Sequence, residues 1–160
     1  MNSHALIVGK FAPLHAGHQF LIDTALSESR ALTVLVYSNP DFDDMPQPVR
    51  ADWVSQLYPS ALVLTPDDPP LDSADDDTHR RYVASFLRRH DIEVDAVYTS
   101  EDYGDGFAAV LGVRHRLVDR KRIAFPVSGT LARDDLARNW RFLPAPVQAH
   151  FRRLGVVDVP

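Results

Sequence analysis

The stretch Ala5-Leu6-Ile7-Val8-Gly9-Lys10-Phe11-Ala12-Pro13-Leu14-His15-Ala16-Gly17-His18 decides the fold of this chain. Its first four residues are apolar, which predicts a buried β-strand. Gly9 follows where that strand ends, and Pro13 stiffens the turn. Gly17 and His18 then open a helix. A strand, a tight turn and a helix in this order begin a parallel α/β unit.

The rest of the chain repeats this alternation of strand and helix. We expect strands over residues 5–8, 32–37, 61–64, 95–99 and 115–118. We expect helices over residues 18–29, 49–57, 78–90 and 106–111. The alternation predicts an α/β fold with a Rossmann-like, doubly wound parallel sheet of about five strands and helices on both faces. Residues 1–160 are expected to form a single domain, with a core over 1–142 and a helical tail over 143–160.

Composition bounds the class of protein. The chain has 160 residues, 45% of them hydrophobic and 24% charged, which is ordinary for a soluble globular domain. It contains no cysteine, which excludes disulfides and thiolate metal sites. Neither an apolar run of transmembrane length nor a signal-peptide pattern is present, so a cytoplasmic location without a membrane partner is expected.

Charge is unevenly distributed along the chain. The formal net charge of -5 argues against a nucleic-acid partner, because such binding depends on basic surface. The acidic run over residues 67–77 is interpreted as a solvated, exposed loop. The basic run over residues 114–122 suits a small polyanion better than a duplex.

The turn after the first strand carries the residues of a phosphate site. A helix N-terminus presents free N–H groups and a partial positive charge, and Lys10 adds a full charge nearby. His15 and His18 are three residues apart, so one helical turn can direct both at one anion. The turn matches neither the dinucleotide fingerprint nor the Walker A motif, and a zinc site would need a third ligand. Either histidine alone would be a helix or loop cap, but together with Gly9 and Lys10 they favour an anion site.

A second candidate anion site lies at Ser128-Gly129-Thr130-Leu131-Ala132-Arg133. Ser128 or Thr130 is a good N-cap, and Arg133 one turn later can donate to two phosphate oxygens. The alternative is an ordinary capped helix with a surface arginine.

The first motif, Gly-Lys-Phe-x-Pro-x-His-x-Gly-His over residues 9–18, resembles the signature of the HxGH nucleotidylyltransferases. The second resembles the same family's Ser/Thr-rich turn that ends in x-x-Arg. This resemblance implies a nucleotidyltransferase with Lys10, His15, His18 and Arg133 as catalytic residues. It also implies that Ser128, Thr130 and Arg133 hold the β- and γ-phosphates of the nucleoside triphosphate.

Further stretches resemble the NadR-type branch, whose acceptor is nicotinamide mononucleotide (NMN). They are Arg50-x-x-Trp53, the Ser100-Glu101-x-Tyr103 stretch and the segment around residues 140–147. The substrate-binding residues expected from the resemblance and from the sheet rim are Gly9, Phe11, Pro13, Gly17, Ser38, Asn39, Arg50, Trp53, Ser100, Glu101, Tyr103, Ser128 and Thr130. Trp53 could equally be a core residue. Arg50 could pair with a carboxylate, and the polar residues at 101 and 103 could simply end a strand.

The implied reaction transfers AMP from ATP to NMN by direct in-line attack, giving NAD and pyrophosphate. Mg²⁺ is expected as cofactor, held mainly through substrate phosphates and without a protein metal site. The kinase of the NadR branch is not expected in this chain, and a homo-oligomer stays open. The alternatives are another phosphate acceptor or a nucleotide-sensing module that binds without turnover. A dehydrogenase is disfavoured because the glycine fingerprint is missing.

Overall fold

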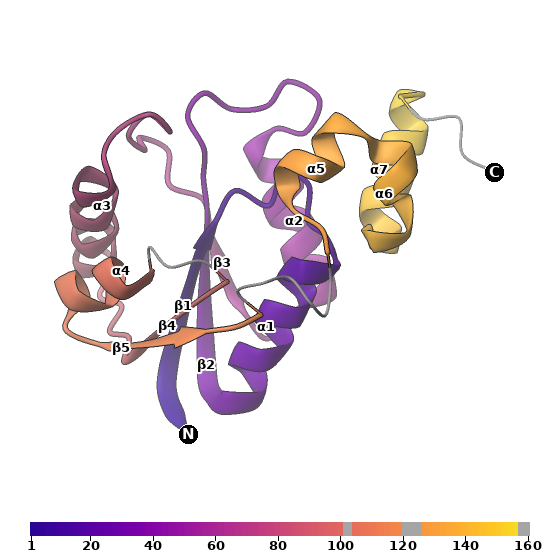
Figure 1. The fold of residues 1–160 in the computed structure, drawn as a ribbon. Helices are drawn as coiled ribbons and strands as arrows, with labels where there is room; N and C mark the ends of the chain where they lie inside the picture. Colours follow the sequence, from indigo (N-terminus) through magenta and orange to yellow (C-terminus); the bar gives the residue numbers. More distant parts are fainter. Residues whose placement is uncertain (101–103, 120–125, 157–160) are drawn as a thin grey trace.

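The computed structural model describes residues 1–100, 104–119 and 126–156. Its centre is a parallel sheet in the order β3-β2-β1-β4-β5 (Figure 1). The strands are β1 (Asn2–Gly9), β2 (Ser29–Val36), β3 (Leu62–Leu64), β4 (Ala96–Thr99) and β5 (Arg114–Leu117). The central strand is β1, which pairs with β2 on one side and β4 on the other. The predicted doubly wound parallel sheet is confirmed.

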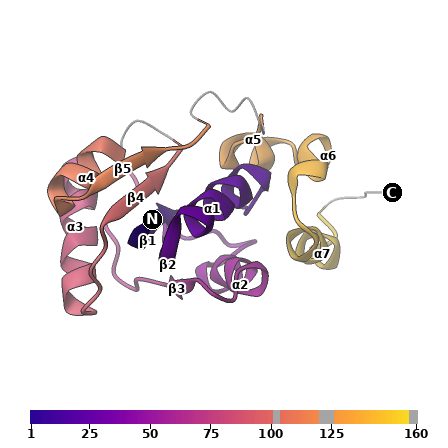
Figure 2. The ribbon, with the colours of Figure 1, turned by 90° about the horizontal axis from the view of Figure 1, so that it is seen from below.

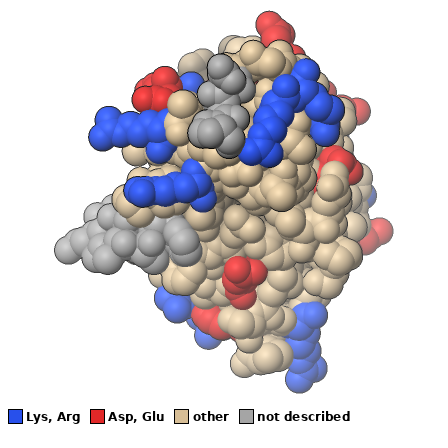
Figure 3. Space-filling view, turned by 90° about the vertical axis from the view of Figure 1, so that its right-hand side faces the viewer, with Lys and Arg blue, Asp and Glu red and all other residues tan. Residues whose placement is uncertain are grey.

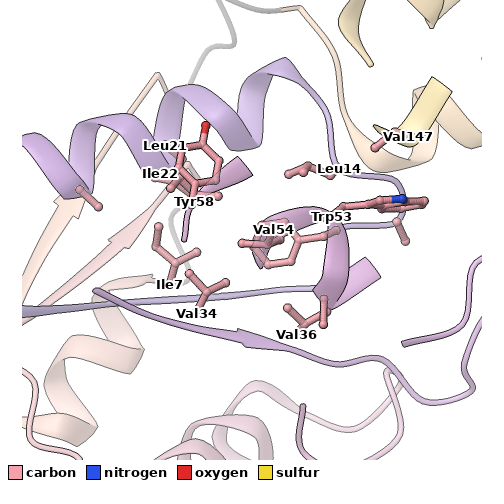
Figure 4. Close-up of a cluster of buried hydrophobic side chains, with 14 of the residues drawn as sticks. Ile7, Leu14, Leu21, Ile22, Val34, Val36, Trp53, Val54, Tyr58 and Val147 are labelled. Carbon is pink, nitrogen blue, oxygen red and sulfur yellow. The ribbon is translucent and has the colours of Figure 1, made fainter. Parts of the chain in front are cut away.

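Alternation along β1 divides the core into two halves. Ala5 and Ile7 belong to the cluster that includes the buried residues of α1 and α2, whereas Leu6 belongs to the cluster of α3. Successive side chains of a strand point to opposite faces, so a fully apolar strand requires helices on both sides. Figure 2 shows α1 and α2 on one side of the sheet and α3 and α4 on the other, and Figure 4 shows the larger cluster.

The helices covering the sheet are α1 (Ala16–Glu28), α2 (Gln47–Leu57), α3 (Asp76–Arg89) and α4 (Gly104–Leu111). The first helix begins at Ala16, two residues before the expected start, because His15 is its N-cap. It ends at Glu28 and β2 begins at the next residue, so no loop separates them. The expected positions of all four helices are otherwise close to those observed.

The C-terminal segment is helical and packs on the core. It contains α5 (Gly129–Asp134), α6 (Leu136–Asn139), the 3₁₀ turn η1 (Trp140–Phe142) and α7 (Ala145–Leu154). Val147 and Phe151 of α7 are fully buried in the same cluster as Trp53, whose ring lies 6.3 Å from that of Phe151. The His150 ring nitrogen Nε2 also lies 2.6 Å from the carbonyl of Asp44. Trp53 therefore packs against α7 in the core.

The surface of this C-terminal side is mixed. Figure 3 views it and shows basic side chains spread among uncharged surface, with acidic ones between them. Exposed arginines of this segment are Arg138, Arg141, Arg152 and Arg153. Within the described part of the chain, every helix is too short or too polar to cross a membrane.

Candidate nucleotide site

The candidate site is a cavity of about 410 Å³ at the carboxyl ends of the central strands. Gly9 at the end of β1, Thr99 at the end of β4 and the first turn of α1 all line it. Helices α3 and α5 close its sides through His79 and Arg133. This is where an open parallel sheet binds ligands, because the loops after its strands meet there.

His15 and His18 form a reciprocal cap at the start of α1. The His15 Nδ1 accepts hydrogen bonds from the backbone N–H groups of Gly17 (3.1 Å) and His18 (3.4 Å). The His18 Nδ1 accepts one from the backbone N–H of His15 (3.2 Å). The two rings stack with their centroids 3.7 Å apart. The two histidines therefore cap the helix, as the alternative interpretation expected, and they also line the cavity.

This cap fixes the chemistry that each ring presents. A ring nitrogen that accepts from a backbone N–H carries no proton, so each neutral imidazole has its proton on Nε2. His15 and His18 therefore each have an Nε2–H donor. The first turn of α1 contains no acidic side chain, so the partial positive charge of this 13-residue helix is not offset. The arrangement favours an anion at the helix N-terminus.

Glycine at position 17 is required by the His15 ring. A β-carbon there would lie 2.9 Å from His15 Cε1 and 3.0 Å from His15 Nδ1. The ring is only 2% exposed and is stacked on His18, so it has little room to move. The turn before it is also strained, since Phe11 has a φ of 52°, in the left-handed region. The sequence motif thus encodes a particular packing of two rings.

The second motif is tied directly to the first. Ser128 is the N-cap of α5 and accepts a hydrogen bond from the backbone N–H of Leu131 (3.1 Å). Arg133 donates from Nη1 to the carbonyl of Ala12 (2.6 Å) and from Nη2 to Thr130 Oγ1 (3.3 Å). Two motifs more than 100 residues apart therefore form one wall of the cavity.

Lys10 projects from the end of β1 and is paired with an acidic loop. Its Nζ lies 3.1 Å from Asp72 Oδ2. The other oxygen of Asp72 accepts a hydrogen bond from the backbone N–H of Asn39 (2.9 Å). Asp72 and Asp76 line the cavity, so part of the acidic run belongs to the site and is more than solvated surface.

Arg50 lies beneath the site and is fully buried. Its guanidinium donates to the carbonyl of Lys10, to the carbonyl of Met45 (2.9 Å), to Ser38 Oγ (3.3 Å) and to Asp41 (2.6 Å). Burial by itself would raise the pKa of Asp41, but backbone N–H groups and the Arg50 guanidinium hold that pKa below its usual value. Arg50 thus anchors the backbone from which Lys10 projects.

The structure separates the sequence-predicted site residues into three groups. Ten line the cavity: Gly9, Lys10, Phe11, His15, Gly17, His18, Ser100, Ser128, Thr130 and Arg133. Five are placed behind it and brace it or fill the core: Pro13, Ser38, Asn39, Arg50 and Trp53. Glu101 and Tyr103, with residues 120–122 of the basic run, lie outside the described residues.

The cavity also contains residues that sequence reasoning did not single out. Tyr37 follows β2, and its hydroxyl lies 3.0 Å from Nδ1 of His79, whose ring is stacked on it. The Nε2 of His79 lies 3.0 Å from the carbonyl of Leu71, which can only accept a hydrogen bond. Phe107 of α4 completes this side. Tyr37 could have been found from its position, because it directly follows a strand whose carboxyl end faces the ligand-binding edge of the sheet.

Two curated proteins are similar in sequence to this chain. The trifunctional NAD biosynthesis/regulator protein NadR of Escherichia coli K12 is 26% identical over 165 residues, covering 92% of this chain. NadR of Salmonella typhimurium LT2 is equally similar. The chain is homologous to NadR. It spans 40% of the length of these relatives. No protein-family model matches it.

Solved structures share the fold. A NadR structure in complex with NR has a TM-score of 0.64 at 21% identity, covering 96% of this chain and 45% of that chain. A NadR structure with NAD and AMP-PNP gives 0.61 at 20%, covering 96% and 46%. A bifunctional NMN adenylyltransferase/ADP ribose pyrophosphatase from Francisella tularensis, complexed with AMP and a Mn ion, gives 0.62 at 14%, covering 99% and 50%. These structures show that the fold is shared, and the curated relatives confirm the predicted resemblance to the NadR branch.

Proposed function

We propose that this domain transfers AMP from ATP to NMN, giving NAD and pyrophosphate. The observation that carries the proposal is the stacked pair of His15 and His18 at the N-terminus of α1, in one cavity with Lys10 and Arg133. NadR relatives named for NAD biosynthesis support the choice of acceptor.

The reaction needs positioning and charge stabilisation more than it needs a base. The attacking group is a phosphate oxygen of NMN. Since the second pKa of a phosphomonoester is about 6, that oxygen is already mostly deprotonated at neutral pH. The barrier comes from repulsion between two anionic substrates and from charge that spreads over the α-phosphate. Preorganised hydrogen-bond donors lower such a barrier.

Each residue of the cavity has a different role in this proposal. The Nε2–H groups of His15 and His18 donate to the α-phosphate as charge develops. Lys10 contacts phosphates of both substrates. Arg133, with Ser128 and Thr130, holds the departing pyrophosphate, as the family resemblance implies.

We expect a divalent cation to enter the site bound to the substrate phosphates. Among the described residues, no three His, Asp or Glu side chains gather as a protein metal site would. Mg²⁺ bound to the triphosphate would supply neutralisation of phosphate charge. The carboxylate that could hold such a cation is that of Asp76, which lines the cavity.

The proposal is tested by measuring pyrophosphate release from ATP with four acceptors: NMN, nicotinic acid mononucleotide, FMN and phosphopantetheine. NMN should be turned over, with NAD identified by chromatography. His18→Ala should lower kcat by roughly 100-fold or more, as for the loss of one preorganised donor. His90→Ala is the matched control, since His90 is exposed at the end of α3 and outside the cavity lining.

Three outcomes would change the proposal. Turnover with another acceptor would keep the site and replace its substrate. Calorimetric binding of ATP and NAD without turnover by any acceptor would favour a nucleotide-sensing module. Wild-type turnover by His18→Ala would remove the histidine pair from the mechanism.

A further inference from the structure

We infer that Asp72 is an internal anionic ligand of Lys10, which competes with phosphate for the lysine and lowers the affinity of the cavity for pyrophosphate. The inference depends on the proposed function only in that the cavity accepts a polyphosphate. It assigns the acidic loop a role in releasing the product.

The carboxylate of Asp72 is held at both oxygens. Oδ2 lies 3.1 Å from Lys10 Nζ, and Oδ1 accepts the backbone N–H of Asn39 at 2.9 Å. The backbone N–H of Asp72 donates in return to the carbonyl of Asn39 at 2.7 Å. This three-point attachment fixes the carboxylate beside the ends of β1 and β2.

The loop that carries Asp72 is braced along its length. The side chain of Asn39 donates to the carbonyl of Pro69 (3.0 Å), and that of Gln47 donates to the carbonyl of Pro66 (2.8 Å). His79 holds the carbonyl of Leu71, directly before Asp72. The chain that leads to Asp72 is therefore held at three of its carbonyl groups.

The two partners differ in freedom. The Lys10 side chain is 48% exposed and long, whereas that of Asp72 is 27% exposed and anchored. When a polyphosphate enters, Lys10 can turn toward it and Asp72 stays in the cavity lining. The incoming anion must then displace Asp72 from Lys10 and lie near a fixed negative charge. Both effects weaken binding, and both act equally on the leaving pyrophosphate.

The test is calorimetric titration of the intact chain with inorganic pyrophosphate in the presence of Mg²⁺. Asp72→Asn keeps an acceptor for the Asn39 N–H and removes the charge. Pyrophosphate affinity should rise about 5-fold, the upper range of what an exposed ion pair contributes. Asp77→Asn is the matched control, because it makes the same charge change on α3 at a residue that pairs with Arg81 outside the cavity lining. It should change affinity less than about 2-fold.

A double-mutant cycle with Lys10→Met separates competition from general electrostatics. If Asp72 acts through Lys10, most of the increase in pyrophosphate affinity caused by Asp72→Asn disappears in the Lys10→Met background. Titration followed by phosphorus NMR extends the measurement to weak binding. Unchanged or weaker binding by Asp72→Asn overturns the inference, as does an equal gain in both backgrounds. Absence of pyrophosphate binding in both the parent chain and Asp72→Asn also overturns it. Because no step requires turnover, the inference can hold in a chain that fails the adenylyl-transfer assay.

Discussion

Replacing Gly17 by alanine should lower kcat strongly while changing the stability of the fold only slightly. The added β-carbon would lie 2.9 Å from His15 Cε1, closer than side chains pack, so the His15 ring must shift. It cannot shift without losing its hydrogen bonds to the N–H groups of Gly17 and His18 and its 3.7 Å stack on the second ring. Both Nε2–H donors would then point away from their present direction.

The stability change should be small because two terms oppose each other. Loss of an N-terminal cap costs about 1 kcal/mol. Alanine in a helix gains up to about 1 kcal/mol over glycine. For a chain of this size, a net change of up to about 1 kcal/mol moves Tm by no more than roughly 4 °C. The activity change should be large, since displacing preorganised donors costs about 100-fold in kcat per donor.

The assay is steady-state pyrophosphate release by Gly17→Ala beside its thermal unfolding. Gly112→Ala is the control, because Gly112 has a φ of +69°, has open space around it and is outside the cavity lining. It should lose about 1–2 kcal/mol of stability from backbone strain and keep wild-type kcat. Retention by Gly17→Ala of more than about a third of wild-type kcat would show that the packing of the two rings does not set the activity.

Three further outcomes are expected. Arg133→Ala should raise the KM for ATP about 10-fold, as for loss of a charged hydrogen-bond donor, and an unaltered KM and kcat would leave Arg133 with only its brace to the Ala12 carbonyl. Asp41→Asn should destabilise the fold by roughly 1–3 kcal/mol at pH 7, because the buried Arg50 loses its charged partner. The pKa of Asp41 is lower in the folded state than in the unfolded state, so its stabilising contribution is fully present above about pH 4 and is lost progressively as pH falls from there through the folded pKa. The stabilities of wild type and variant, measured by urea unfolding, should therefore approach each other below about pH 4, and a constant difference would contradict this origin. Trp53→Phe should lower Tm yet leave both KM values unchanged, since Trp53 packs on α7; a raised KM would return it to the substrate site.

The local elements of the site were predictable because their signals are local. The apolar run over residues 5–8, the glycine and proline of the turn and the paired histidines are all contained in one short segment. The segment therefore specifies strand, turn and helix whatever surrounds it. The start of α1 was misplaced by two residues because a histidine N-cap is rare and gives no ordinary capping signal.

Arg50 and Trp53 illustrate what spacing does not reveal. Their i, i+3 positions place them near each other on α2, but do not say whether that face meets solvent, ligand or core. Trp53 is covered by α7, about 100 residues later, whereas Arg50 is covered by the end of β1 and by the loop that contains Asp41 and Met45. Contacts over such separations depend on the path of the whole chain.

The sequence by itself determined that this protein has a parallel α/β sheet and two anion-binding motifs, since periodicity and short motifs are properties of neighbouring residues. Only the tertiary structure decided how those motifs meet. It placed the Arg133 guanidinium on the carbonyl of Ala12, the Asp72 carboxylate on Lys10, and the Tyr37–His79 pair in the same cavity. Each of these contacts joins two segments that follow different strands of the sheet. The distance between those segments depends on the order and register of the strands, and a short stretch of sequence does not specify either.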